Sequence, residues 1–376
     1  PIISLQDGKL LGFEALARWI DPELGFVSPA KFIPLAEERG IIASLTDKLL
    51  LHAAKVAAGW PDGIFLSFNL SSVQLVDPNT ASEIISTIKK AELPPERLEI
   101  EVTETGLMKD IHSAMSILDQ LSKEGVEIAL DDFGTGNSTF DRINHIKPQL
   151  IKIDKSLFVN IKNNLINKEI VKAITNMSHN LGIKVLAEGV EDIDAICTCL
   201  KSSINLFQGY YFSKPKAEIS NKDVEKLYYD VLDVSKEFRQ RNLNNISKKR
   251  ELIGAYNLLV EDIIKGINNI NHLYTLLEKK FTQLDDIEAI YLIDVLTSKQ
   301  LMDTIIQKSE NELFLASCDG EEHFLKEYYY ITLETKQGIY LSQRYISYAT
   351  GNICKTFAKK IFLNQKEYIL CLDIII

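Results

Sequence analysis

The chain is organised around one short stretch, Leu130-Asp131-Asp132-Phe133-Gly134-Thr135-Gly136. The apolar run Val126–Leu130 predicts a buried strand that ends at two adjacent carboxylates. Neighbouring residues on a regular strand point to opposite faces, so the two Asp side chains can share a site only where the backbone turns. Gly134 and Gly136 permit such a turn because glycine adopts positive φ at little steric cost. Two carboxylates held together repel each other, and a divalent cation would stabilise them; the alternative is a surface Asp-Asp turn that caps a helix.

Composition limits the kind of protein. The chain has 376 residues, 46% of them hydrophobic, which suffices for two domains or for one barrel with a smaller module. The net charge of −10 argues against a general nucleic-acid surface, so DNA is not an expected partner. No apolar run reaches the ~18 residues needed to span a bilayer, and no signal peptide is visible. Both ends, Pro1–Ile3 and Ile374–Ile376, are strand-like and are expected to be cuts through a larger protein.

Cysteine usage indicates a reducing compartment, and we therefore expect a cytoplasmic protein. The cysteines are odd in number and lack zinc-finger spacing: Cys197, Cys199, Cys318, Cys354 and Cys371. The six histidines are scattered without an H-E-x-x-H pair, so a histidine-based metal site is not expected.

Strand and helix patterns alternate up to about residue 215. The predicted strands are Ile2–Leu5, Leu11–Arg18, Phe65–Ser71, Leu98–Glu104, Glu127–Asp132, Leu150–Lys155, Lys184–Val190 and Leu206–Phe212. Amphipathic helix patterns lie between them, for example from Ile111 to Leu121 and from Ile170 to Leu181. About eight such units predict an α/β fold, a parallel (β/α)₈ barrel of the TIM type. The alternative is an open doubly wound sheet, but no Gly-rich phosphate loop follows the first strand.

The period of two places polar residues on one face of these strands, toward their carboxyl ends. A single polar residue in a strand is usually a satisfied hydrogen bond, whereas a polar residue on strand after strand is harder to explain as structure. In a barrel these groups would converge at the carboxyl-terminal mouth, where such folds carry out chemistry. The residues of this face are Glu14, Arg18, Ser67, Asn69, Ser71, Glu99, Glu101, Thr103, Lys152, Asp154 and Glu188.

An ordered set of motifs resembles the EAL-domain cyclic di-GMP phosphodiesterases over roughly residues 1–216. A lone E-A-L tripeptide is weak evidence, but the complete set in order is highly specific. The set comprises Glu14-Ala15-Leu16 with Arg18 and Trp19, Asn69 in Phe68-Asn69-Leu70-Ser71, Glu101-Val102-Thr103-Glu104, the central loop from Asp131 to Gly136, Lys152-Ile153-Asp154, Glu188-Gly189-Val190-Glu191, and Gln208-Gly209-Tyr210 with Pro215.

The resemblance implies a site for two divalent metals, Mg²⁺ or Mn²⁺, held by oxygen and amide ligands. One metal would be held by Glu14, Asn69, Glu101 and Asp131. Asp131 would bridge to a second metal, which Asp132 and Glu188 would also hold. The pair would activate a water that attacks the phosphodiester.

The resemblance also assigns roles around the metals. Lys152 would orient the attacking water or accept its proton, with a pKa depressed by the neighbouring metals. Glu104 and Glu191 would support the ligands and complete the catalytic group, and Glu104 would hold the loop from Asp131 to Thr139, which also shapes a dimer interface. The substrate would be contacted by Leu16, Arg18, Asp154, Gln208 and Pro215.

The sequence departs from the family pattern at a few positions. The Gln that usually precedes the opening Pro is absent, and Asn137 and Ala17 replace a common Tyr and a larger aliphatic residue. None of these changes removes a metal ligand or the lysine. We therefore expect hydrolysis of cyclic di-GMP to linear 5′-pGpG. The alternatives are a silent cyclic di-GMP receptor that acts through dimer rearrangement, and some other metal-dependent barrel hydrolase.

A second region follows Pro215. Apolar residues from Leu252 to Leu277 alternate spacings of three and four, which predicts either a coiled-coil seam between two chains or a helix packed on its own domain. Predicted strands follow at Ala289–Val295, Leu313–Ser317, Ile339–Tyr345, Ile353–Ala358 and Tyr368–Ile374. This pattern resembles a small α+β sensor domain of the PAS-like or Cache type, with an unknown small ligand.

These patterns together predict three segments: an EAL barrel over 1–216, a helical linker over 217–285 and a sensor domain over 286–376. We expect a homodimer in which the sensor alters how two barrels associate. A charge placed in the seam, as in Ile263→Asp, is then expected to weaken the dimer.

Overall fold

The computed structural model describes residues 1–103, 110–134, 143, 146–306, 317–347 and 351–376. The chain divides into two compact units, Pro1–Gln240 and Arg241–Ile376. The division falls within one long helix, α8 (Asn221–Ile264), whose first part packs in the first unit and whose last part packs in the second.

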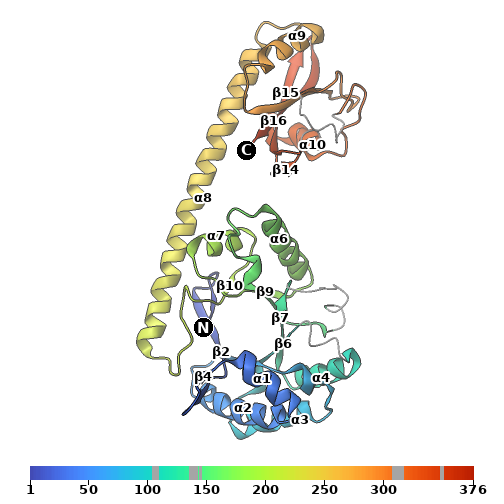
Figure 1. Cartoon of the computed structure of the whole chain (residues 1–376). Helices are drawn as coiled ribbons and strands as arrows, with labels where there is room; N and C mark the ends of the chain where they lie inside the picture. The colour runs from blue at the N-terminus through green and yellow to red at the C-terminus, as the bar shows by residue number, and fades with distance from the viewer. Residues whose placement is uncertain (104–109, 135–142, 144–145, 307–316, 348–350) are drawn as a thin grey trace. The chain divides into compact units, whose positions relative to one another are not determined.

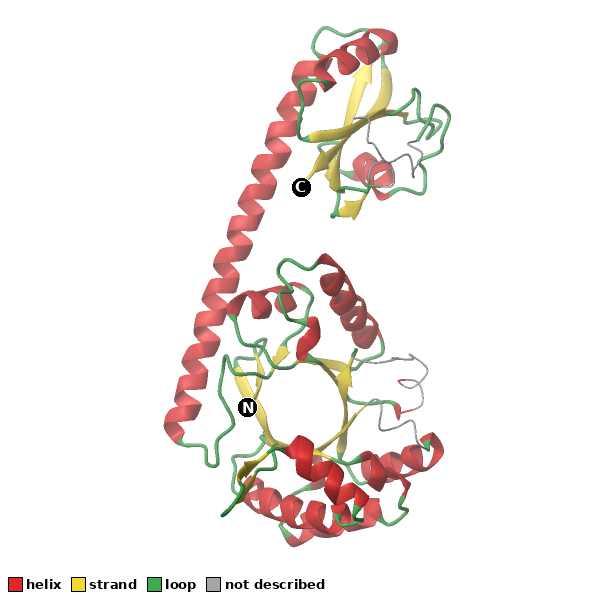
Figure 2. Cartoon of the chain, in the orientation of Figure 1, coloured by secondary structure: helices red, strands yellow, loops and turns green. Residues whose placement is uncertain are grey.

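The first unit is a closed eight-stranded barrel, which Figure 2 shows as a ring of yellow strands. Every predicted strand of this unit is confirmed, although several end two to five residues earlier than expected. The strands follow the order β1-β10-β9-β8-β7-β6-β5-β2 around the ring. They are β1 (Ile2–Ser4), β2 (Lys9–Ala15), β5 (Phe65–Asn69), β6 (Leu98–Thr103), β7 (Glu127–Phe133), β8 (Leu150–Ile153), β9 (Lys184–Ala187) and β10 (Leu206–Phe207).

One strand departs from the uniform parallel barrel that the sequence predicted. β1 runs antiparallel to both of its neighbours, β2 and β10, whereas the other neighbouring pairs are parallel. The connection from Ser4 to Lys9 is too short for a crossover helix and turns at Gly8, whose φ is +65°. A hairpin therefore opens the barrel where a β-α-β unit was expected.

Helices surround the barrel, as Figure 1 shows. Three of them begin at an Asp or Asn whose side chain accepts a backbone N–H: Asp110 before α4, Asn164 before α6 and Asp192 before α7. Their apolar stripes bury the outward residues of the strands in one continuous core. The helices are α1 (Pro29–Glu38), α2 (Ile42–Ala58), α3 (Thr80–Lys90), α4 (Ile111–Lys123), α6 (Leu165–Asn180) and α7 (Ile193–Lys201), with a hairpin of β3 (Trp19–Asp21) and β4 (Gly25–Val27) and 3₁₀ turns at Ser72–Val76, Pro95–Arg97 and Lys155–Leu157.

The second unit is an antiparallel sheet in the order β12-β11-β16-β15-β13, with β14 also paired to β15. One face packs against α8 and α9, and the other against α10. The predicted strands Ala289–Val295, Ile353–Ala358 and Tyr368–Ile374 are confirmed, whereas Ile339–Tyr345 is divided into two short strands and most of Leu313–Ser317 lies outside the described residues. The short strand β12 was not predicted. The elements are α9 (Ile270–Phe281), β11 (Ile287–Asp294), β12 (Ile305–Ile306), α10 (Glu327–Glu334), β13 (Ile339–Leu341), β14 (Tyr345–Ile346), β15 (Ile353–Leu363) and β16 (Lys366–Ile375).

The heptad pattern belongs to the core of this second unit. Tyr256, Ile263, Leu273 and Leu277 are buried against the sheet, and the backbone between α8 and α9 turns at Gly266, whose φ is +77°. The coiled-coil interpretation is therefore wrong, and so is the expectation that Ile263→Asp would act through a seam between chains. The spacing of three and four is the same for a helix packed on its own sheet, so the pattern alone did not separate the two.

Across the described residues, no helix combines the length and the apolar composition that crossing a membrane requires.

Candidate active site and metal centre

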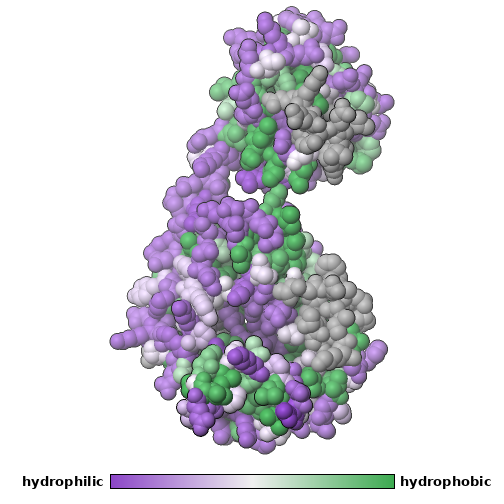
Figure 3. All heavy atoms as spheres, in the orientation of Figure 1, coloured by the Kyte–Doolittle hydropathy of each residue, from purple (hydrophilic) through white to green (hydrophobic). Residues whose placement is uncertain are grey.

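The interior of the barrel has an apolar layer followed by a polar one. Ile2, Ala129, Leu150 and Leu186 form a buried cluster inside the ring. Because side chains on one face of a strand recur every second residue, the next inward positions on three of these strands are Asp131, Lys152 and Glu188. Figure 3 shows hydrophilic residues at the middle of the barrel. The alternation that the sequence showed thus places these groups at the carboxyl ends of the strands.

A bulge in β7 brings the two adjacent aspartates to one site. The register between β7 and β8 shifts between Leu130 and Phe133, and Asp132 has a φ of +55°. This left-handed conformation is uncommon for a residue other than glycine, although Asp tolerates it better than most. Carboxylate oxygens of Asp131, Asp132 and Glu188 consequently lie within 4.8 Å of one another. The turn that the sequence assigned to Gly134 and Gly136 therefore begins at Asp132 itself; Gly136 lies outside the described residues.

Lys152 occupies the centre of the acidic ring. Its Nζ lies 2.5 Å from Glu188 Oε1 and 2.6 Å from Glu101 Oε1. The same atom lies 3.8 Å from Asp131 Oδ1 and 3.9 Å from Glu14 Oε2. The Lys152 side chain is only 1% exposed. One buried cation thus faces four carboxylates, which lie on β2, β6 and β7 and directly after β9.

The charge state of Lys152 follows from these neighbours. Burial by itself lowers the pKa of an ammonium group, but the surrounding carboxylates, Glu101 and Glu188 first among them, raise the pKa of Lys152 well above its usual value. The expected depression of the pKa concerned Lys152 beside two bound metals, so it stays a prediction; without metals the pKa shifts in the opposite direction. The sequence could not show this, because the partners of Lys152 come from distant parts of the chain.

The carboxylates respond in the opposite way to burial. Burial raises the pKa of Glu188 to about 7 and raises that of Glu101, Asp131 and Asp132 as well. Each of these groups loses hydration and also repels its acidic neighbours, so the ring has less positive charge than its ionised form needs. Further cationic charge would restore the ionised form of all four groups.

The residues present suit a divalent metal. The buried Oε2 of Glu101 has no hydrogen-bond partner, so a carboxylate oxygen remains open for coordination. Asn69 Nδ2 donates to Glu14 Oε1 at 2.7 Å, an arrangement that leaves the amide oxygen of Asn69 available as a ligand. Gln208 Nε2 donates to the other oxygen of Glu14. Carboxylate and amide oxygens are the donors that hard divalent cations prefer.

A supporting hydrogen-bond chain lies beneath this ring, and the functional assignment from sequence did not include it. Ser67 Oγ lies 2.6 Å from Glu99 Oε1 and 2.5 Å from Glu101 Oε1. The single hydroxyl proton of Ser67 can serve only one of these acceptors, so the other contact requires a protonated carboxyl. Burial raises the pKa of Glu99 to about 7, which makes Glu99 the natural carrier of that proton. The sequence did indicate this contact, because its alternation places Ser67 of β5 and Glu99 and Glu101 of β6 on the inward face of their strands.

The remaining predicted residues surround this centre more loosely. Leu16 is 40% exposed, and the exposed Arg18 donates from Nη1 to the carbonyl of Ala17 at 2.9 Å. Asp154 accepts the N–H of Ser156 at 2.8 Å and adds to the repulsion that raises the pKa of Asp132. Glu191 and Pro215 are exposed. Glu104, Asn137 and Thr139 lie outside the described residues.

The fold and the acidic centre define a barrel with an oxygen-rich cluster at the carboxyl ends of its strands. The family model described as EAL domain matches residues 1–215, and the chain belongs to this family. An uncharacterized signaling protein of Caulobacter vibrioides is 39% identical over 215 residues, which are 57% of this chain and 27% of that protein. The probable cyclic di-GMP phosphodiesterase PdeG of Escherichia coli is 33% identical over 219 residues, 57% of this chain and 43% of that protein.

The fold of the whole chain is similar to that of the YkuI protein of Bacillus subtilis, which has an EAL domain. The crystal structure of YkuI in complex with its substrate c-di-GMP and calcium matches 100% of this chain and 94% of its own, with a TM-score of 0.81 and 19% sequence identity. The chain spans only 27–43% of the lengths of the two curated relatives above.

Proposed function

We propose that the barrel hydrolyses cyclic di-GMP to linear 5′-pGpG with the help of two divalent metals, Mg²⁺ or Mn²⁺. The observation that carries the proposal is the ring of Glu14, Glu101, Asp131 and Glu188 around the buried Lys152. Membership of the EAL-domain family supports it, since relatives of the barrel include proteins named as cyclic di-GMP phosphodiesterases. The calcium complex of YkuI with c-di-GMP provides a precedent for a divalent metal beside this substrate.

The metals would be held by two overlapping sets of ligands. One set would consist of Glu14, Asn69, Glu101 and Asp131, and the other of Asp131, Asp132 and Glu188. When bound, the metals would supply an activated water and would stabilise charge on the phosphodiester. The hydrogen bonds from Asn69 and Gln208 hold both oxygens of Glu14 in fixed directions, which orients that ligand in advance.

Lys152 would act as a fixed cation at the reacting centre. Its raised pKa in the metal-free protein favours the role of orienting the attacking water over that of a base. Arg18 would bind a phosphate of the substrate, because its guanidinium is exposed. The other predicted substrate contacts are Leu16, Asp154, Gln208 and Pro215, and Glu104 and Glu191 would support the ligands.

One experiment separates this function from its alternatives. The full chain would be incubated with cyclic di-GMP and Mg²⁺ while binding and product are measured together. Turnover to the linear dinucleotide supports the proposal. Binding without turnover would indicate a silent receptor, and neither binding nor turnover would indicate some other barrel hydrolase.

We propose in addition that the second unit is a PAS-like sensor that controls the barrel. The sheet supports this assignment. When its five main strands are numbered along the chain, their spatial order is 2-1-5-4-3, and a long helix precedes a small sheet with helices on one face and a short helix on the other, in agreement with that resemblance. The five cysteines form no disulfide bond, which agrees with a cytoplasmic protein.

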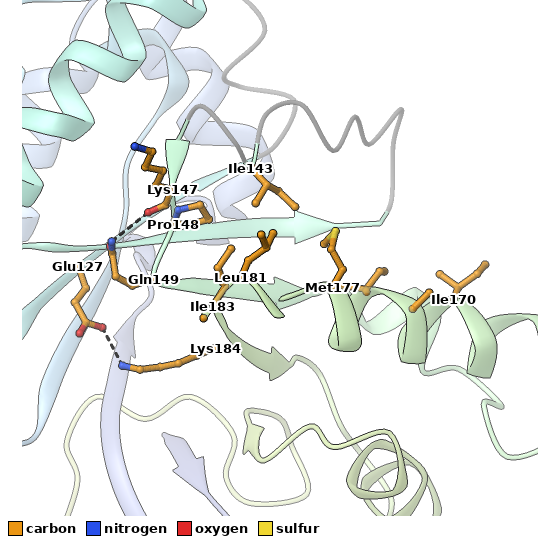
Figure 4. A pocket seen from close by; sticks show the side chains of 13 residues that line it. Glu127, Ile143, Lys147, Pro148, Gln149, Ile170, Met177, Leu181, Ile183 and Lys184 are labelled. Carbon is orange, nitrogen blue, oxygen red and sulfur yellow. Dashed lines mark hydrogen bonds and ion pairs between the residues drawn. The ribbon is translucent and has the colours of Figure 1, made fainter. Parts of the chain in front are cut away.

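We also propose that the active protein is a homodimer joined through the barrels. An apolar cavity of about 1070 Å³ opens beside α6, and Figure 4 shows Ile170 and Met177 of this helix at its edge with Ile143 nearby. Figure 3 shows hydrophobic residues at this surface. Ile143 follows the central loop, which by family resemblance shapes a dimer interface, so a second copy of the chain is the occupant that we expect.

A further inference from the structure

The second unit contains a cavity of about 340 Å³ beside α10, on the face of the sheet opposite α8 and α9. Its floor includes Ala289 on β11, Asp373 on β16 and Thr356 on β15. These residues lie side by side, because Ala289 and Thr356 are both register partners of Asp373. Because the side chains of Ala289 and Thr356 are small, they leave space above the carboxylate of Asp373. Three tyrosines also line the cavity: Tyr291, Tyr328 and Tyr345.

The floor carries a buried negative charge. Asp373 is 8% exposed, and its Oδ1 accepts hydrogen bonds from Thr356 at 2.8 Å and from Tyr291 at 3.4 Å. Burial raises its pKa to about 6, so the carboxylate is still ionised at neutral pH. Within the described part of the chain, no Lys, Arg or His lies at ion-pair distance from it, and the charged side chain that acts on it, Glu288, is also an acid. A buried carboxylate without a counter-ion is unfavourable, so a cationic group bound beside it would be strongly stabilised.

The rim of the cavity carries the opposite charge. Arg344 and Lys326 line it and are exposed, and neither forms an ion pair or a side-chain hydrogen bond with another described residue. The rim also contains Glu327, but the hydroxyl of Tyr340 donates to its Oε2 at 2.9 Å. A molecule that fills the cavity therefore meets negative charge at the floor and the cationic Arg344 and Lys326 at the mouth.

We propose that this cavity binds a free α-amino acid, with the ammonium group at Asp373 and the carboxylate at Arg344 and Lys326. The volume lies at the small end of the range for small-molecule sites, which suits one amino acid. Planar tyrosine walls favour an apolar or aromatic side chain. The inference deepens the proposed sensor role, yet binding can be measured without any turnover by the barrel.

The test is isothermal titration calorimetry of the full chain against the twenty amino acids at up to about 10 mM each. At least one should bind. Two analogues of the amino acid that binds should each bind at least about 10-fold more weakly than it does. One is the corresponding amine, which lacks the carboxylate, and the other is the corresponding carboxylic acid, which lacks the ammonium group. Asp373→Asn keeps the shape but removes the charge and should weaken binding by at least about 30-fold, whereas Asp285→Asn, at an exposed acid of the same unit, should not change it.

Arg344→Gln provides a second variant in case Asp373→Asn does not fold, because Arg344 is exposed; it should also weaken binding. Absence of binding by every amino acid would overturn the proposal, as would binding that Asp373→Asn and Arg344→Gln leave unchanged. Binding of guanosine monophosphate in place of amino acids, with the same dependence on Asp373, would also overturn it. Turnover of cyclic di-GMP measured on the same samples without amino acid reports separately on the function of the barrel.

Discussion

Lys152 Nζ and Glu101 Oε1 lie 2.6 Å apart inside the barrel, and their side chains are 1% and 0% exposed. A pair buried this deeply depends on both partners, since removing one leaves an uncompensated charge away from water. The same two residues lie in the ring that would hold the metals. Stability and the proposed catalysis are therefore expected to be coupled in this barrel.

Lys152→Ala should destabilise the metal-free protein by about 3–5 kcal/mol, because four carboxylates lose their buried counter-ion. Added Mg²⁺ should restore much of this stability by replacing the lost positive charge. Thermal unfolding with and without Mg²⁺ measures both effects, and the variant should gain more from the metal than the wild type does. A metal-free variant as stable as the wild type would contradict the counter-ion role. Turnover at saturating substrate should be largely lost in either case.

Asp131→Asn should reduce turnover by more than about 100-fold, the upper end of what loss of an outer supporting group costs. Asp131 is the one ligand expected in both metal sets, and an amide cannot provide its negative charge. The fold should survive, because the buried Asp131 has a raised pKa and a neutral side chain is tolerated there. Glu191→Gln, at an exposed residue, is the matched control and should cost less. A well-folded Asp131→Asn protein with near wild-type turnover would exclude the two-metal assignment.

Ser67→Ala should lower metal affinity by about 10–100-fold while leaving the ligands themselves in place. The hydroxyl bridges Glu99 and Glu101, so its loss frees Glu101 to rotate and leaves buried carboxyl oxygens without a partner. Calorimetric titration with Mn²⁺ measures the affinity directly. Ser67→Thr retains the hydroxyl and should restore most of it. If the Ser67→Ala variant binds Mn²⁺ as tightly as the wild type does, the hydrogen bonds of Ser67 do not position Glu101.

The Glu99→Gln variant should be more stable than the wild type above pH 7, and the two should have similar free energies of unfolding below pH 4.5. The pKa of Glu99 is raised from an ordinary 4.5 to about 7, so the folded state binds a proton that the unfolded state releases. The stabilisation from that proton is present at low pH and is lost as the pH rises through 7, a change of about 3 kcal/mol for this group. Urea unfolding at pH 4.5 and pH 8 measures the difference. Equal stability of variant and wild type at pH 8 would show that Glu99 is already ionised at no cost.

Ile263→Asp should unfold the second unit and leave the barrel folded. Ile263 is fully buried in the core of that unit, and a charge there costs more than about 4 kcal/mol. Leu258→Asp lies on the same helix at a side chain that is 66% exposed and is the control. Calorimetry should show the loss of one unfolding transition for Ile263→Asp only. An intact second unit in that variant would mean that the core tolerates the charge.

Met177→Glu should weaken the proposed homodimer by placing a charge at the edge of the apolar cavity beside α6. Asn176→Glu, at the adjacent exposed position outside the cavity lining, should leave the oligomeric state unchanged. Light scattering across a concentration series gives the result. A wild-type protein that is monomeric at every concentration yet fully active would remove the dimer from the mechanism.

The strands of the barrel could be predicted from the sequence because their signal is local. Alternation along Leu98–Thr103 assigns Glu99 and Glu101 to one face without any knowledge of what lies opposite. The same local rule located Glu14, Asn69, Lys152 and Glu188. It did not detect the antiparallel direction of β1, because an isolated strand has the same pattern in either direction.

The properties that depend on distant neighbours were decided only by the tertiary structure. The direction of the pKa shift of Lys152 depends on acids that lie on or directly after four other strands, and Coulomb energy depends on distance in space. The bulge at Asp132 arises from its pairing with β8, and the heptad residues of α8 found their partner in their own sheet. The sequence by itself determined which residues face the centre of this barrel. The packing of strands from across the chain decided their charge, their contacts and the helix faces that are buried, because burial and electrostatics are set by the whole fold.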